Sequence, residues 1–120
     1  MKKGILLVVL LFMLLTLTNC KKEDSILKVF VRSTSNQLIN GSNVIVIGDQ
    51  QSTPPTGAFV DTVFTNSSGF STINMDNYFS ASATTTGYFD IIVKYNSKVG
   101  TGYSRCRVHS TSVETIYLEN

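Results

Sequence analysis

The sequence of 120 residues has no tryptophan, one histidine, two cysteines and two prolines, and only 15% of its residues are charged. Soluble domains average about 25% charged residues. A single histidine and eight acidic residues leave little material for a metal site or a hydrolytic centre. The length allows at most one small domain. These shortages disfavour enzymes and metalloproteins.

Long apolar runs are confined to the first nineteen residues. Lys2 and Lys3 precede an apolar stretch over residues 5–17 that is interrupted only by Thr16. Such a stretch rises about 20 Å as a helix, which is too short for a hydrocarbon core of about 30 Å. A positive start followed by a short apolar stretch is typical of a signal peptide. We therefore expect a signal-peptide helix over residues 1–19.

This segment ends on Leu17-Thr18-Asn19-Cys20, which resembles the lipobox of bacterial lipoproteins. Leu17 and Cys20 match the pattern, Thr18 is tolerated in it, and Asn19 stands where Gly, Ala or Ser is usual. The resemblance implies that signal peptidase recognises Leu17, Thr18 and Asn19, and that Cys20 is lipidated. Two or three acyl chains anchor a protein stably, so the membrane is the first expected partner. An ordinary secretory signal with an incidental cysteine and an uncleaved anchor are the alternatives.

Residues 20–24 are expected to form the lipidated cysteine and a charged tether. The run Lys21-Lys22-Glu23-Asp24 cannot pack into a core. In bacterial lipoproteins an aspartate directly after the cysteine favours the inner membrane, so Lys21 points to the outer membrane. Residues 22–24 resemble a signal by which some Gram-negative groups export lipoproteins to the cell surface. We expect a location in the cell envelope, in the outer membrane rather than the inner, with surface exposure; a plain solvated linker is the alternative.

The mature chain would be neutral. Without Lys2 and Lys3, eight basic residues balance eight acidic ones. Nucleic-acid binding depends on neutralising phosphates, so nucleic acid is not an expected partner. With Cys20 acylated, Cys106 has no disulfide partner in the chain. Because it lies in a strand-like alternating run, we expect a small buried side chain; a reactive thiol or an intermolecular bridge is the alternative.

From residue 25 onward, apolar side chains repeat every second residue, and no window of eleven or more residues keeps a helical stripe. In the clearest run, Phe89, Ile91 and Val93 share one face. The pattern predicts an all-β fold, a seven-stranded antiparallel β-sandwich over residues 25–120, with a loop over residues 76–87 that crosses between the sheets. The expected strands are Ile26–Arg32, Asn43–Ile47, Phe59–Thr65, Phe70–Met75, Tyr88–Tyr95, Thr101–His109 and Val113–Glu119.

Several spaced motifs carry a resemblance to a known family. They are Leu27-x-Val29-x-Val31, Leu38-x-x-Gly41-x-x-Val44-x-Val46, Thr65-Asn66-x-x-Gly69-Phe70 and Tyr88-Phe89-Asp90-Ile91-x-Val93. Their arrangement resembles the carboxypeptidase regulatory-like domains, over nearly all of residues 25–119. The resemblance implies a transthyretin-like (prealbumin-like) sandwich. An immunoglobulin-like sandwich is the alternative, and the missing tryptophan and cysteine pair argue against its disulfide-bearing form.

No catalytic residue, metal or cofactor is expected. The enzymatic relatives of transthyretin use several histidines, an arginine and a C-terminal Tyr-Arg-Gly-Ser, whereas this chain has only His109 and ends in Tyr-Leu-Glu-Asn. No Gly-x-Ser-x-Gly elbow occurs. The acidic residues are scattered without the spacing of calcium ligands. His109 is expected at a strand end, solvated or hydrogen-bonded.

Three aromatic residues are candidates for ligand contact. Tyr78, Phe79 and Tyr88 lie in or beside the expected crossing loop. Aromatic side chains on loops supply contact area for glycans or proteins at a low cost in entropy. The alternative is that Phe79 and Tyr88 cap the core.

Two short motifs are candidates for modification. Asp-Ser-Ile at residues 24–26 and Asp-Thr-Val at residues 61–63 resemble bacterial O-glycosylation sequons. The acceptors would be Ser25 and Thr62.

The sequence thus favours a non-enzymatic binding or interaction module of the cell envelope. Its partners would be the membrane, through acyl chains on Cys20, and another envelope protein or a glycan. Edge strands of a sandwich can also pair with another chain. A purely structural envelope lipoprotein is the alternative. A hydrolase is the most distant one, because it would need a cleft that converges on His109.

Overall fold

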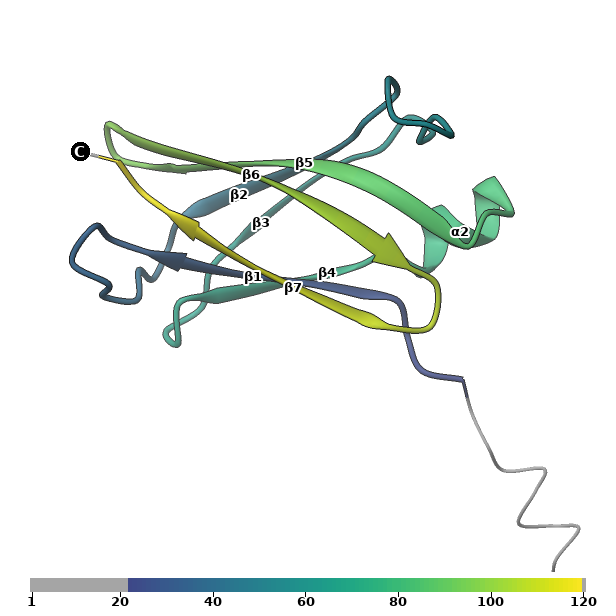
Figure 1. Cartoon of the computed structure of the whole chain (residues 1–120). Helices are drawn as coiled ribbons and strands as arrows, with labels where there is room; N and C mark the ends of the chain where they lie inside the picture. The colour runs from purple at the N-terminus through teal and green to yellow at the C-terminus, as the bar shows by residue number, and fades with distance from the viewer. Residues whose placement is uncertain (1–21, 120) are drawn as a thin grey trace, which may run out of the picture.

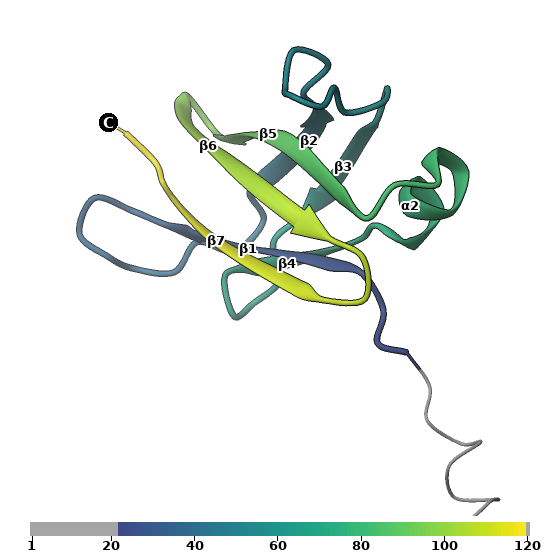
Figure 2. The ribbon, with the colours of Figure 1, turned by 45° about the vertical axis from the view of Figure 1, so that its right-hand side comes forward.

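A computed structural model describes residues 22–119, which form two β-sheets packed face to face (Figures 1 and 2). The three-stranded sheet has the order β4-β1-β7 and the four-stranded sheet the order β3-β2-β5-β6. The elements are β1 (Ile26–Arg32), β2 (Asn43–Gly48), β3 (Val60–Phe64), β4 (Phe70–Asn74), α2 (Asp76–Ser82), β5 (Thr86–Tyr95), β6 (Lys98–Arg107) and β7 (Thr111–Tyr117). The expected signal-peptide helix, with Leu17, Thr18, Asn19 and Cys20, lies outside the described residues.

The core lies between the sheets and follows the alternation in the sequence. Every second residue of β1 and of β5 is buried, while the residues between them face outward. Period-two side chains lie on one face of a strand, which is why the all-β sandwich is confirmed. Nine core side chains have no exposed surface at all: Leu27, Val29, Val31, Val44, Val46, Met75, Phe89, Ile91 and Val93.

One strand pair differs from the expected antiparallel arrangement. β7 pairs with β1 in parallel, from Ile26 opposite Thr111 to Arg32 opposite Tyr117. The chain leaves β6, crosses to the other sheet and begins β7 beside the start of β1, where the Ile26 N–H donates to Ser110 O at 2.9 Å. Alternation of side chains is the same in parallel and antiparallel strands, so the pattern could not show the direction.

Helix α2 stands where a loop was expected. It spans only seven residues and is followed by the C-cap residue Ala83, which has a left-handed backbone with φ of 54°. Two turns of Ser, Ala and aromatic residues are too short to show a helical period. Tyr78 and Phe79 are buried on this helix and join Phe59 and Phe89 in an edge-to-face aromatic cluster at one end of the core.

Ser25 fixes the entry of the chain into β1. Its N–H donates to Asp76 Oδ1 at 2.8 Å, its carbonyl accepts from the Met75 N–H at 2.8 Å, and its hydroxyl accepts from the His109 N–H at 2.8 Å. The first of these bonds holds the pKa of Asp76 below its ordinary value. Glu23, two residues before Ser25, is also held at this junction, because its carbonyl oxygen is hydrogen-bonded to His109 Nδ1 at 3.0 Å.

Cys106 and His109 lie where the sequence predicts. Cys106 is buried on β6, with 1% of its surface exposed, and burial raises the pKa of its thiol. His109 follows the end of β6 on the turn into β7 and is hydrogen-bonded. Among residues 22–119, no helix has the length and apolarity to cross a bilayer.

Candidate functional site

The expected contact loop is reduced to one of its three residues. Tyr78 and Phe79 are only 7% and 4% exposed, because helix α2 turns both rings into the aromatic cluster. The Tyr78 hydroxyl is also occupied, accepting a hydrogen bond from the Gly57 N–H at 3.1 Å. The prediction that these two residues contact a ligand is therefore wrong for this structure. Tyr88 is half-buried, on the outward face of β5.

The two expected glycosylation acceptors differ in access. Ser25 is fully buried and its hydroxyl holds the His109 N–H, so the structure excludes Ser25 as an accessible acceptor. The reason is that this serine closes the junction between β1, α2 and the β6–β7 turn. Thr62 is exposed on β3, and its modification stays a prediction.

Tyr88 forms a stacked pair with Tyr103 on the outer face of the four-stranded sheet. The ring centroids are 6.2 Å apart and the planes are inclined by 24°. Tyr88 lies opposite Arg105, and Tyr103 lies opposite Asp90, so the two rings are diagonal neighbours on adjacent strands. Tyr103 is 46% exposed. We name Tyr88 and Tyr103 the tyrosine platform.

Asp49 ties the platform to the long loop between β2 and β3. Its Oδ2 accepts from the Tyr103 hydroxyl at 2.7 Å, and its Oδ1 accepts from the Gln51 N–H at 3.0 Å. The Asp49 carbonyl accepts from the Thr56 N–H at 3.1 Å, and Thr56 Oγ1 accepts from the Tyr88 N–H at 2.8 Å. These bonds hold the loop at Asp49 and Thr56 beside the platform.

Two hollows lie beside the platform. One, of about 440 Å³, is lined by the acidic side chains of Asp49 and Asp90, the amides of Gln50 and Gln51, and apolar residues of β2 and β3. The other, of about 480 Å³, contains Tyr88, Arg105, two prolines and a run of threonines. Each is in the size range of a small-ligand site. The surface thus offers aromatic faces with a carboxylate on one side and a guanidinium on the other.

The bond to Asp49 raises the pKa of Tyr103 to about 12 from an ordinary 10.0, because ionisation would place two negative charges side by side. Alkaline difference absorbance measures the ionisation of tyrosines, and the signal that is missing in Tyr103→Phe belongs to Tyr103. We expect this signal to appear near pH 12 in the unmodified protein and closer to pH 10 in Asp49→Asn. A folded-state pKa above the unfolded one means that the bond stabilises the fold below pH 10.0 and that this contribution is lost as the pH rises through about 12. Formation near pH 10 in the unmodified protein would mean that the bond is absent in solution.

Sequence reasoning missed Tyr103, Asp49 and Arg105 as parts of one surface. The expected strand over residues 101–109 places Cys106 inward, which already puts Tyr103 and Arg105 on the outward face. The alternation within this strand does not show its register with β5, and it is this register that places Tyr103 beside Tyr88. Asp49 bonds to Tyr103, which is 54 residues away in the sequence, so this contact depends on tertiary structure and no local pattern could predict it.

Among the described residues, neither a group of metal ligands nor the histidine lies at the platform. In the part of the chain that the structure describes, no three His, Cys, Asp or Glu side chains gather in a way that could hold a metal ion. His109 lies on the β6–β7 turn and is not among the residues that line either hollow.

The fold defines the described chain as an all-β sandwich domain. No protein-family model matches the sequence, and no curated protein matches it. Among solved structures, the Bacillus anthracis TIE protein is similar, with a TM-score of 0.54 and 14% sequence identity over 82% of this chain and 17% of that one. The chain therefore spans about a sixth of that protein's length. A likeness at this identity shows the fold alone.

Proposed function

We propose that the protein is a membrane-anchored envelope lipoprotein whose sandwich domain binds a carbohydrate at the tyrosine platform. The observation that carries the binding proposal is the stacked pair of Tyr88 and Tyr103, solvent-accessible between two hollows and held by Asp49. Binding without catalysis agrees with the scarcity of catalytic side chains in the sequence.

The chemistry of the platform suits a sugar. A pyranose ring has an apolar face of C–H groups and a rim of hydroxyls, and tyrosine rings offer a large apolar contact with a polar edge. Asp90 and Arg105, which flank the platform on β5 and β6, can accept from and donate to the hydroxyls. The fixed loop means that little conformational entropy is lost when a ligand binds.

The envelope location rests on the N-terminal sequence. The lipobox-like run that ends at Cys20 and the charged residues 21–24 support an outer-membrane lipoprotein that is exposed on the surface. The spaced motifs support the narrower placement among carboxypeptidase regulatory-like, transthyretin-like domains. A glycan of a neighbouring cell or of the envelope itself would then be within reach of the platform.

Another envelope protein is the second candidate partner, because edge strand β3 exposes two large apolar side chains. Val60 and Phe64 are 71% and 65% exposed. Pairing of a new strand along this edge is hindered, since Asp61 Oδ1 accepts from the Thr62 N–H at 2.9 Å and an edge-strand carboxylate repels an incoming strand. A contact through the side chains of β3 is therefore the form that this alternative takes.

The test is a glycan array probed with the detergent-solubilised lipoprotein, followed by calorimetry on the glycans that bind. Tyr103→Ala should weaken binding at least about tenfold, or about 1.4 kcal/mol, because half of the platform is removed. Tyr117→Ala is the matched control: Tyr117 is 53% exposed and lies on β7 of the other sheet, so its loss should leave the affinity unchanged. Equal losses in the two variants, or binding to no glycan, would rule out the platform as a carbohydrate site.

A further inference from the structure

The outer face of the three-stranded sheet combines positive charge with aromatic surface. Its outward side chains alternate with the buried ones along β1, β4 and β7, and both of the charged ones, Lys28 and Arg32, are positive. The large apolar side chains on this face include Phe30, Phe70, Val113 and Tyr117, of which the last two are 55% and 53% exposed. We name these six residues the β1 face.

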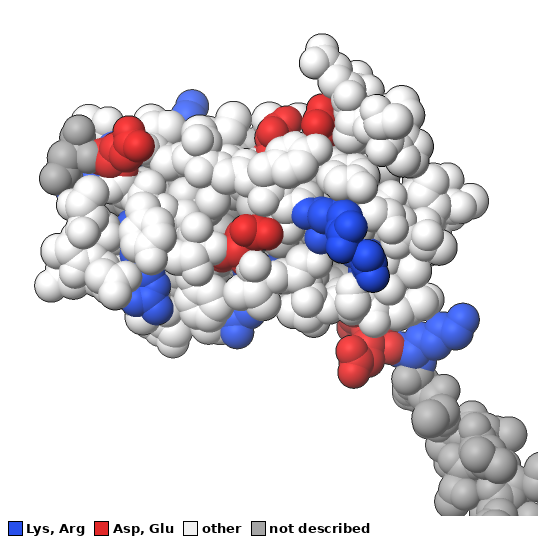
Figure 3. Space-filling model, viewed as in Figure 1, with Lys and Arg blue, Asp and Glu red and all other residues white. Residues whose placement is uncertain are grey.

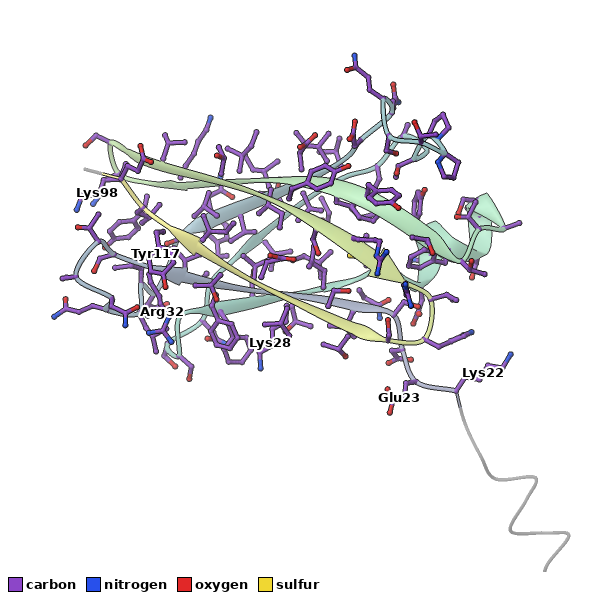
Figure 4. All side chains as sticks on the ribbon, in the orientation of Figure 1. Lys22, Glu23, Lys28, Arg32, Lys98 and Tyr117 are labelled. Atoms are coloured by element: carbon purple, nitrogen blue, oxygen red, sulfur yellow. The ribbon has the colours of Figure 1, made fainter. Side chains whose placement is uncertain are left out.

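Lys28 places its ammonium group over two aromatic rings on the outer face of the sheet. Its Nζ lies 4.1 Å from the centroid of the Phe70 ring and 5.1 Å from that of Phe30, and these rings are 5.5 Å apart. Figure 4 shows the side chain pointing away from the sandwich. Arg32 lies opposite Tyr117 farther along the same face. Cations beside aromatic and aliphatic groups are the composition of surfaces that lie at a bilayer interface.

The chain enters the domain on the same side as this face. In Figures 1 and 2 the segment that precedes β1 lies below the three-stranded sheet, next to the N-terminal end of β1. Figure 3 shows Lys and Arg side chains along this lower edge of the domain, while the Asp and Glu side chains near it lie at the tether. The two positive charges of Lys21 and Lys22 balance the two negative charges of Glu23 and Asp24, so the tether adds no net charge.

The tether is too short to separate the domain from the bilayer by a large distance. Glu23 is held by His109, and Ser25 by Asp76 and the β6–β7 turn. Only three peptide units separate Cys20 from Glu23 in the sequence. Three units span about 10 Å at full extension. Acyl chains on Cys20 would therefore keep Glu23, and the β6–β7 turn that holds it, within about 10 Å of the lipid. This distance is comparable to the Debye length of about 8–10 Å within which surface charges interact.

We propose that the β1 face lies on an anionic phospholipid surface, with Lys28 and Arg32 at the headgroups and Phe30, Phe70, Val113 and Tyr117 at the interface. This inference rests on lipidation of Cys20, which is part of the proposed function. Its consequence is an orientation: the opposite face of the sandwich, with the tyrosine platform, is turned away from the bilayer and towards ligands.

The test uses single tryptophans in the lipidated protein, since the chain has none of its own. Thr115 lies next to Phe30 on the β1 face, and Thr101 is an exposed threonine on the outer face of the other sheet. The variants Thr115→Trp and Thr101→Trp are reconstituted into vesicles that contain phosphatidylglycerol and brominated phosphatidylcholine. Fluorescence of Thr115→Trp should be quenched and that of Thr101→Trp should not.

Charge variants then test the role of the cations. In the Thr115→Trp protein, Lys28→Glu with Arg32→Glu should lower the ratio of membrane-bound to free β1 face by about 25-fold or more, at about fivefold for each cation removed. Lys94→Glu with Arg107→Glu makes the same change in net charge on the other sheet and should leave the quenching as it was.

Two results would overturn the inference. One of them leaves the membrane anchoring of the proposed function intact, and the other overturns that anchoring too. If the protein floats with the vesicles but Thr115→Trp is quenched no more than Thr101→Trp, the β1 face does not lie on lipid, while anchoring stands. If the protein does not float with the vesicles at all, lipidation of Cys20 fails and the orientation fails with it.

Discussion

Replacing Phe89 by alanine should lower the free energy of unfolding by about 3–5 kcal/mol. Phe89 has no exposed surface and belongs to the aromatic cluster, with its ring centroid 5.2 Å from that of Tyr78 and 5.5 Å from that of Phe59. Both contacts are edge-to-face, a geometry that adds stabilisation beyond the buried area. The cavity would form where both sheets and helix α2 meet, so little of the surrounding structure can collapse into it.

Urea denaturation followed by circular dichroism measures this loss. Phe64→Ala is the matched control, because Phe64 is 65% exposed on edge strand β3, and its loss should change the stability by no more than about 0.5 kcal/mol. A domain of this size typically has a stability of about 5–15 kcal/mol, so Phe89→Ala removes a large share of it. A similar shift of the midpoint in both variants would contradict the burial of Phe89 in the core.

The strands of the fold could be predicted because burial and alternation are local. Leu27, Val29 and Val31 can share the core only if residues 26–32 are extended, and the bounds of β1 are as expected. β5 begins two residues before the expected start, at Thr86. The physical reason is that Gly87 contributes no side chain to the pattern, although it is buried beside the Phe89 and Tyr78 rings.

What the sequence could not show depends on pairing between distant segments. The parallel register of β1 with β7 and the stacking of Tyr88 on Tyr103 both follow from which strands are neighbours. The accessibility of Tyr78 and Phe79 also depends on tertiary structure. A short polar-rich segment with two aromatic residues can form either an exposed loop or a short helix that covers the end of a core. Only the tertiary structure decides between them.

Replacing Cys20 by serine should abolish acylation of the protein completely. In the proposed lipoprotein, the thioether and the amide that carry the acyl chains would form on the cysteine sulfur and on the amino terminus that cleavage before Cys20 exposes, so the variant could receive neither. Each buried methylene contributes about 0.8 kcal/mol to anchoring, and two or three chains are lost together. Incorporation of an alkyne-tagged fatty acid, detected on the immunoprecipitated protein, measures the effect.

Cys106→Ser is the control that separates the two thiols of the chain. Cys106 is 1% exposed and burial raises the pKa of its thiol, so in the folded domain it offers neither access nor thiolate to an acyl donor. Labelling should therefore persist fully in Cys106→Ser and disappear in Cys20→Ser, whose chain should also retain residues 1–19 and migrate more slowly in gels. Label that persists in Cys20→Ser would show that Cys20 is not the anchor. The short tether would then no longer hold the β1 face at the bilayer, and the platform would have to meet its ligand from a free domain.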